Sequence, residues 1–475
     1  MFKDLLSDTL KYGIGKVILK FFSILIVPII AKNFPPDIFG EINIVTIFVS
    51  LFLGISVLGL DSAVGYYYYH GDNNLKKDFL GTSFIIRIFI SFVIFILFYI
   101  FAKKLSNTNF LLKNSEKYLL IILGAAVIPF DNCMSFFVDL SRFLIKPILY
   151  NIANISKVLI YYILIVIFLF NNLTIEKILI SILISSIIPA IFLLFYYKQM
   201  LNFKLNIYCL KKLLIYGLPL VPASIMYFFM NSANRFVLNI FTTLEEVGIY
   251  SLMNSISSIF LLLTSSIIMA WPPYAMIIAK KDNAAIIYAK ITTILIILLI
   301  PLALIFWSIS DFAILIFSTP IYLKGENIII LLIMQHILNL LYYCVSIGLI
   351  LKEKTIYISI VYTIAAVLSV LISFPLCKYF GIFGAAISSF IGFFISTQYV
   401  AFKSNHFYKI PYNTKFIFIY IFLILSILFL LLFLNNSNII FNFLIRFSIG
   451  CVFLIIPFIF KIFKFSEIKL LFINE

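Results

Sequence analysis

The sequence predicts an all-α integral membrane protein that crosses a bilayer about fourteen times. Three observations predict this fold class. Of 475 residues, 64% are hydrophobic and only 11% are charged, and the mean hydropathy is +1.16. A soluble domain is about 45–50% apolar and about 25% charged. Apolar stretches of spanning length recur along the whole chain, and most charged residues lie between them.

A membrane-spanning helix needs about 20 mostly apolar residues. By that criterion we expect helices at residues 12–31, 41–60, 83–102, 118–139, 148–170, 175–196, 213–236, 247–270, 285–307, 327–349, 356–375, 382–400, 415–434 and 440–460. The first stretch has spanning length and lacks the small-residue exit of a cleavable signal, so we expect it to remain as a helix.

The basic residues between the spans predict the orientation of the chain. If the N-terminus is inside, Lys and Arg in the inside loops outnumber those in the outside loops by more than two to one. Cytoplasmic loops carry such an excess. We therefore expect an even number of helices and both termini in the cytoplasm.

Composition also excludes several kinds of site. The net charge of +16 is explained by cytoplasmic loops, and no basic stripe on a soluble domain indicates a nucleic-acid partner. No Walker A or dinucleotide-binding glycine motif occurs. The cysteines show no CxxC or CxxH spacing, so we expect apolar packing and no disulfide, metal or cofactor. They are Cys133, Cys209, Cys344, Cys377 and Cys451.

A short pattern occurs twice, six predicted helices apart. The first copy has Tyr12-Gly13 at the start of a span and Phe39-Gly40-Glu41 after its end. The second has Tyr216-Gly217 at the start and Glu246-Val247-Gly248 after the end. The spacing indicates a parallel duplication, and duplicated halves with a central site are typical of secondary transporters.

Further motifs coincide with predicted helix ends. They are Tyr12-Gly13 with Pro28, Pro36-Asp37-Ile38-Phe39-Gly40, Gly59-Leu60-Asp61-Ser62-Ala63, Tyr216-Gly217-Leu218-Pro219, Asn234-Arg235-Phe236-Val237-Leu238, Glu246-Val247-Gly248-Ile249-Tyr250, Trp271-Pro272-Pro273-Tyr274 and Gly381-Ile382-Phe383-Gly384-Ala385-Ala386. In order and spacing, the chain resembles the polysaccharide (O-antigen), or Wzx-type, flippases of the MATE-like (multidrug/oligosaccharidyl-lipid/polysaccharide) transporter superfamily over roughly residues 5–400.

The resemblance implies a fold and a function. The fold would have two six-helix lobes around a central cavity, at residues 1–205 and 206–405, and two extra helices at residues 406–475. The function would be alternating-access transport of an oligosaccharide on a polyprenyl pyrophosphate from the cytoplasmic to the periplasmic, or outer, leaflet of a bacterial inner membrane, without enzymatic activity. The partners would be this lipid-linked oligosaccharide, membrane lipids and a coupling cation, either H⁺ or Na⁺.

Two positions depart from the family pattern. The family often has Asp-Arg where this chain has Asn234-Arg235, so a carboxylate partner for Arg235 is missing there. After Ala63 the family commonly has an Arg, whereas this chain runs from Gly65 through four tyrosines to His70. The second departure weakens any assignment of a substrate contact to that segment.

Charged residues inside predicted spans are candidates for the site, because an ionisable group at the bilayer centre costs at least about 2.5–3.5 kcal/mol. Lys157 lies roughly 14 Å in from Ile148 and is the deepest cation. It either contacts the anionic substrate or pairs with Asp131. Lys16 and Lys20 share one face of the first helix. Both are candidate substrate contacts, and the alternative for the shallower Lys16 is contact with headgroups.

Candidates on other helices carry further alternatives. Arg235 lies roughly 28 Å up its helix and either anchors to headgroups or joins Asn231, one turn below, in a polar stripe that binds substrate. Arg87 is expected to snorkel or to pair with Asp61. His336 titrates near neutrality and either couples a cation or packs by hydrogen bonding.

The remaining predictions concern Arg446 and the competing functions. Arg446, in the last span, is expected to contact backbone or headgroups. A MATE-like exporter of small cations is the alternative function, but its cavity should be lined with carboxylates, and Asp131 and Asp61 are outnumbered by basic groups. A membrane polysaccharide polymerase should have a larger external loop than any present here.

Overall fold

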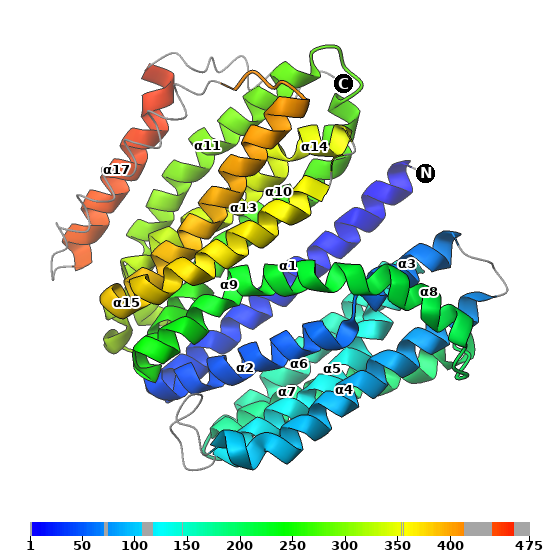
Figure 1. Ribbon diagram of the computed structural model, residues 1–475. Coiled ribbons are helices and arrows are strands. Elements are labelled where there is room, and N and C mark those ends of the chain that lie inside the picture. The colour runs from blue at the N-terminus through cyan, green and yellow to red at the C-terminus, as the bar shows by residue number, and fades with distance from the viewer. Residues whose placement is uncertain are drawn as a thin grey trace. The chain divides into compact units, whose positions relative to one another are not determined.

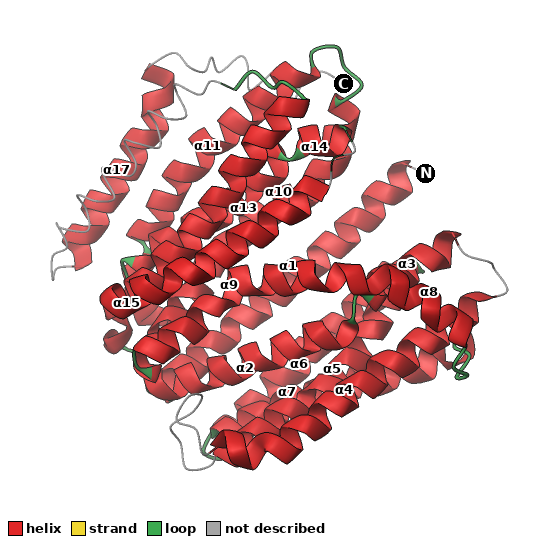
Figure 2. Ribbon diagram, viewed as in Figure 1, coloured by secondary structure: helices red, strands yellow, loops and turns green. Residues whose placement is uncertain are grey.

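The structure, a computed structural model, describes residues 2–70, 75–106, 117–144, 146–352, 354, 356–412 and 439–459. These residues form helices joined by turns, and no strand occurs among them (Figures 1 and 2). The chain contacts divide into two units, Met1–Ser251 and Leu252–Glu475. This boundary differs from residue 205, and the predicted three-part division stays a prediction.

The first unit packs around α5. Its helices are α1 (Phe2–Asn33), α2 (Pro36–Val57), α3 (Leu60–His70), α4 (Lys76–Ser106), α5 (Lys117–Phe143), α6 (Pro147–Leu169), α7 (Ile175–Tyr197), α8 (Ile207–Gly217), α9 (Val221–Phe241) and the first turns of α10 (Leu244–Ile278). α5 packs between α4 and α7, and α6 packs against α7 and α1. α8 and α9 belong here because they pack on α3, α4 and α2.

The second unit contains the rest of α10 and the helices that follow. These are α11 (Ala284–Ser308), α12 (Ser310–Phe317), the 3₁₀ helix η4 (Pro320–Gly325), α13 (Ile328–Val345), α14 (Ile347–Leu351), α15 (Ile356–Phe407) and α17 (Ile439–Ile459). α13 packs on α15 and α11, and α11 packs on α17.

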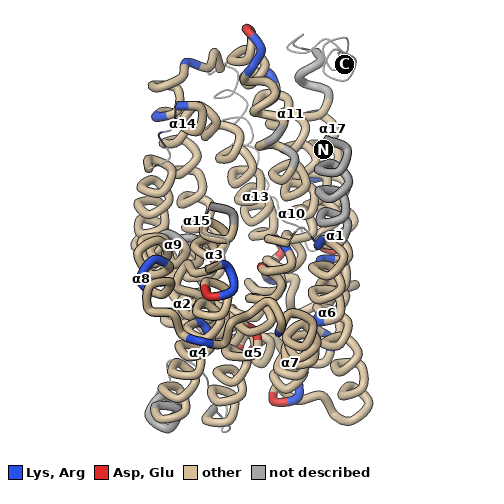
Figure 3. Tube along the Cα trace, turned by 90° about the vertical axis from the view of Figure 1, so that its right-hand side faces the viewer, with Lys and Arg blue, Asp and Glu red and all other residues tan. Residues whose placement is uncertain are grey.

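The helices suit a membrane in length and composition. Ten stretches of the described residues are long and apolar enough to cross one. Figure 3 shows α13 and the part of α7 after Lys177 without a charged residue. The prediction of an all-α, multi-pass membrane protein is therefore confirmed. The number fourteen stays a prediction, and the expected span at 415–434 lies outside the described residues.

Proline and glycine explain where helices break. The expected span at 213–236 divides into α8 and α9, because Pro219 and Pro222 lack the N–H groups that a continuous helix needs. The expected spans at 356–375 and 382–400 form one element, α15, that kinks at Gly381, where φ is 53°. This left-handed value favours glycine, and it separates the two spans as expected.

Two glycine pairs let α2 approach other helices of the first unit closely. A Cβ added at Gly40 would overlap the backbone of Leu244, and one at Gly248 would overlap the backbone of Pro36. At the other end of α2, a Cβ on Gly59 would overlap the carbonyl oxygen of Gly217. Gly40 and Gly248 occupy the corresponding places in the repeated pattern, so the two copies of the pattern meet at their glycines.

Replacing Gly40 with alanine is expected to separate α2 from the start of α10. The added methyl group meets backbone, which cannot rotate away, and such overpacking costs about 1–3 kcal/mol. Gly54→Ala, on the same helix, is the matched control, since a Cβ there meets nothing within 4 Å. The measurement is the Tm of each purified variant in detergent. Equal Tm values for the two variants would show that the contact is loose.

Candidate functional site

The deepest predicted cation, Lys157, lies on α6 and is paired. Its Nζ donates to Oδ1 of Asp131 on α5. Ser186 of α7 donates its hydroxyl to the same carboxylate oxygen at 3.2 Å. The Lys157 and Asp131 side chains are 27% and 17% exposed. The structure therefore forms the Lys157–Asp131 pair, which was one of two alternatives, and contact of Lys157 with substrate stays a prediction.

Lys20 of α1 lies at the same level as Lys157. Two contacts fix how α1 lies on α6: Gly15 meets the side chain of Asn151, and the rings of Phe22 and Tyr162 are 6.4 Å apart. α1 and α6 therefore run parallel, and both lysines fall between these contacts. Lys20 is half-buried, and the ion pairs of the described residues do not include it.

The other three predicted substrate contacts lie on α1 and α9. The side chain of Lys16 lies outside the described residues. Arg235 is half-buried on α9, and its guanidinium lies 6.0 Å from the ring centre of Tyr250. Asn231, one turn before Arg235, is exposed. The face of an aromatic ring, which attracts a cation, therefore lies beside Arg235. The family pattern often has an aspartate directly before this arginine in the sequence, and this chain has Asn234 there.

Arg87 forms a buried polar cluster that differs from the prediction. The side chain is 1% exposed, and its Nη1 lies 3.6 Å from Asp139 Oδ2. Its Nε and Nη2 donate to Asn132 and Ser135, each at 2.9 Å. Pairing with Asp61 was therefore the wrong expectation, because Asp139 of α5 binds Arg87, while Asp61 lines the same small crevice.

Asp139 could have been found from the topology. With alternating spans, Arg87 lies near the inner end of its helix, and Asp139 lies at the inner end of the next one. Consecutive spans pack together in most bundles, and a buried arginine needs a carboxylate.

In the second unit, Arg446 of α17 is buried at 2% exposure. It pairs with two carboxylates, Asp311 at 2.8 Å and Glu326 at 3.3 Å. The expectation that it contacts only backbone or headgroups was therefore wrong, because the segment between two spans folds back as α12 and η4 to meet it. His336, half-buried on α13, stays a candidate for cation coupling.

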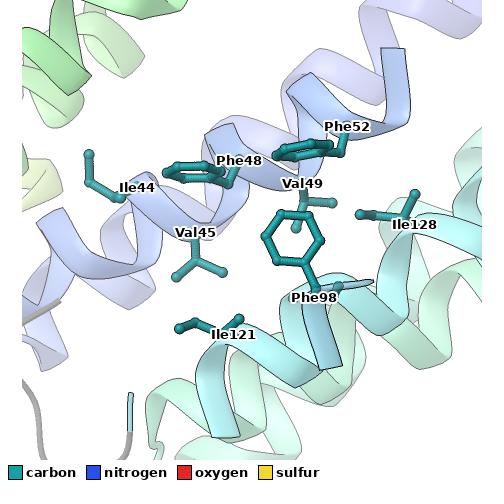
Figure 4. A pocket seen from close by; sticks show the side chains of 10 residues that line it. Ile44, Val45, Phe48, Val49, Phe52, Phe98, Ile121 and Ile128 are labelled. Carbon is teal, nitrogen blue, oxygen red and sulfur yellow. The ribbon is translucent and has the colours of Figure 1, made fainter. Parts of the chain in front are cut away.

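A small apolar crevice lies between α2, α4 and α5 (Figure 4). Phe48 and Phe52 of α2 stack at 6.2 Å, and Phe98 meets Phe52 edge-on at 4.7 Å. The side chains that line this crevice include no polar one. A charged headgroup would find no hydrogen bond there, so this crevice does not fit one.

Comparison with known proteins places the chain among membrane transporters in fold. Residues 5–279 match the family described as Polysaccharide biosynthesis protein. No curated protein matches this sequence. The fold is similar to the lipid II flippase MurJ in an inward closed conformation, with a TM-score of 0.72 and 16% identity over 94% of this chain and 97% of that one.

Two transporters of the MOP superfamily also share the fold. An inward-facing multidrug resistance MATE family transporter has a TM-score of 0.62 and 14% identity, over 83% of this chain and 96% of that one. A MOP superfamily transporter from Pyrococcus furiosus, described as having a binding pocket of reverse polarity, has a TM-score of 0.55 and 15% identity, over 85% and 95%.

Proposed function

Because the chain belongs to the polysaccharide biosynthesis protein family, we propose that it is a flippase for lipid-linked oligosaccharide. It turns a polyprenyl-pyrophosphate-linked unit from the cytoplasmic to the outer leaflet of the bacterial inner membrane, by alternating access. The family match over residues 5–279 is the observation that carries this proposal. The fold shared with a lipid II flippase supports it.

The headgroup of such a lipid needs cations inside the protein. Moving a pyrophosphate into a low-dielectric site is costly unless charge-assisted hydrogen bonds replace its water. Lys20 and Lys157 supply cations at one level of two neighbouring helices. In our proposal Lys157 leaves Asp131 to bind the pyrophosphate, and Lys20 binds it from α1.

Residues nearer the membrane surfaces complete the proposed path. Arg235 and Asn231 contact the headgroup or sugars near the outer end, and Lys16 contacts them near the cytoplasmic end. Both termini are cytoplasmic, as the loop charges indicate. The membrane potential, negative inside, favours outward movement of an anion by about 2.3 kcal/mol per charge per 100 mV.

The alternative is export of small cations, and the fold shared with a multidrug resistance MATE family transporter supports it. A cationic substrate needs carboxylates that are free to bind it. In the described residues, the carboxylates at membrane depth on α5 are already paired, Asp131 with Lys157 and Asp139 with Arg87. Lys20, in contrast, is a cation that the ion pairs of the described residues do not include, and this favours an anionic substrate over a cationic one.

Deletion of the gene tests the proposal in cells. We expect lipid-linked oligosaccharide units to accumulate in the inner leaflet and surface glycan to disappear, while the units are still synthesised. The purified chain should not elongate lipid-linked glycan in detergent. Elongation by the purified chain would instead identify a polymerase, and undiminished surface glycan in the deletion strain would contradict a flippase.

A further inference from the structure

Arg446 forms the centre of a buried charge cluster in the second unit. Its Nη1 donates to Asp311 Oδ1 at 2.8 Å, and its Nη2 donates to Glu326 Oε1 at 3.3 Å and to Asn327 at 3.5 Å. The guanidinium lies over the Trp307 ring, 4.3 Å from its centre. Helices α11, α12 and α17 and the residues that follow η4 therefore close around one cation.

The cluster brings two carboxylates to one guanidinium. Asp311 is 0% exposed, Glu326 is 8% exposed and Arg446 is 2% exposed. The Trp307 ring of α11 lies against the guanidinium, and the Ser310 hydroxyl lies beside Asp311. Lys324 of η4 is exposed. Two carboxylates that are buried around one cation repel each other, and a proton bound to one of them removes that repulsion.

One carboxylate oxygen has room for that proton. Asp311 Oδ1 accepts from Arg446 and from Ser310, the latter at 3.3 Å. Asp311 Oδ2 is buried, and no hydrogen-bond donor or acceptor contacts it in the described part of the chain. A buried anionic oxygen without a donor is a costly arrangement, whereas a protonated oxygen carries no charge there.

We propose that Asp311 Oδ2 binds a proton and that this proton is the ion coupled to transport. The step joins one carboxylate and one proton to give a carboxylic acid, while Oδ1 keeps its bond from Arg446. This role in coupling rests on the proposed flippase function, but proton binding itself does not. The loop charges predict that the segment between the spans at 285–307 and 327–349 lies on the outer side, and we expect the proton to enter from that side.

The acidity of Asp311 agrees with reversible binding near neutral pH. Asp311 lies in α12, between two spans. Burial raises its pKa to about 6, Arg446 opposes this rise, and Glu326 adds to it. The proton is therefore bound as the pH falls below about 6 and released as it rises above that value.

Trp307 reports the state of the cluster without a transport assay. The chain has two tryptophans, Trp271 and Trp307, so a Trp271→Phe variant leaves one reporter beside Arg446. In liposomes, we expect its fluorescence to titrate with a midpoint near pH 6. Asp311→Asn should abolish this titration. Asp282→Asn, at an exposed loop position, should leave it unchanged.

Infrared difference spectra provide a second readout on the chain with both tryptophans. Among the C=O bands that rise on acidification, one with a midpoint near pH 6 should belong to Asp311 and be missing from the difference spectrum of Asp311→Asn. Glu326→Gln removes the neighbouring negative charge, so that variant should keep Asp311 ionised at lower pH. A Trp307 fluorescence titration that survives in Asp311→Asn, or an infrared spectrum in which this variant loses no band, would overturn the site, as would a response to Na⁺ at constant pH.

Coupling is tested separately, by transport in liposomes with an outside-acid pH gradient. The gradient should accelerate flipping by the parent protein and have no effect on Asp311→Asn. If the titration is present but the gradient has no effect on flipping, Asp311 binds a proton that is not coupled. If no lipid moves under any condition, the flippase function fails and the proton site stands on its titration alone.

Discussion

Replacing Lys157 with methionine is expected to lower glycan export about 10- to 100-fold, because each charge-assisted hydrogen bond lost from the pyrophosphate is worth about 1.5–3 kcal/mol. The amount of membrane-inserted protein should stay within the range of the parent strain. Measuring surface glycan and the level of inserted chain in the same cells separates a loss of transport from a loss of protein.

The pair with Asp131 makes a single replacement ambiguous, because it leaves a carboxylate without its cation. Asp131→Asn combined with Lys157→Met removes both charges and therefore also the penalty of an unpaired charge. We expect the double variant to be stable and inactive, and Asp131→Asn alone to keep export. A double variant that exports as well as the parent would show that Lys157 only balances Asp131.

Replacing Arg87 with methionine is expected to destabilise the first unit by about 3–5 kcal/mol, since this leaves the half-buried Asp139 without its main cation. Arg87 also binds Asn132, which receives no substitute donor. The expected result is a marked fall in Tm in detergent and low accumulation in cells.

Arg142 is the matched control, because it contacts the same carboxylate at 3.5 Å but its side chain is 55% exposed. Exposed pairs contribute about 0.2–1 kcal/mol, so Arg142→Met should barely change the Tm. Equal falls in Tm for the two variants would mean that Asp139 depends on both cations and that the burial of Arg87 is unimportant.

Apolar length predicted two neighbouring helices closely, whereas α1 and α4 are longer than the expected spans 12–31 and 83–102. The expected spans 148–170 and 175–196 correspond to α6 at Pro147–Leu169 and α7 at Ile175–Tyr197. Short helices were missed because they lack spanning length, as for α3 and the eight-residue α12. Hydropathy alone assigns both segments to the loops between spans, although tertiary packing makes them helical.

Charged partners were predicted less well than helices, because hydropathy gives the depth of a residue and not the side of the helix on which it lies. Lys157 and Asp131 were placed at compatible depths, and they do meet. For Arg87, depth alone could not separate Asp61 from Asp139, and the packing of α4 on α5 decides for Asp139. The partners of Arg446 lie 120 and 135 residues away, in a segment that had no predicted structure.

Transbilayer movement of a lipid-linked oligosaccharide in liposomes tests the flippase function most directly. The purified chain is reconstituted with a fluorescent polyprenyl-pyrophosphate oligosaccharide in both leaflets, and a quencher that cannot cross the membrane is added outside. We expect quenching to continue past the outer-leaflet fraction in liposomes with the protein, and to stop there with the double variant Asp131→Asn, Lys157→Met or without protein. Quenching that stops at the outer leaflet in all three samples would contradict the proposed function.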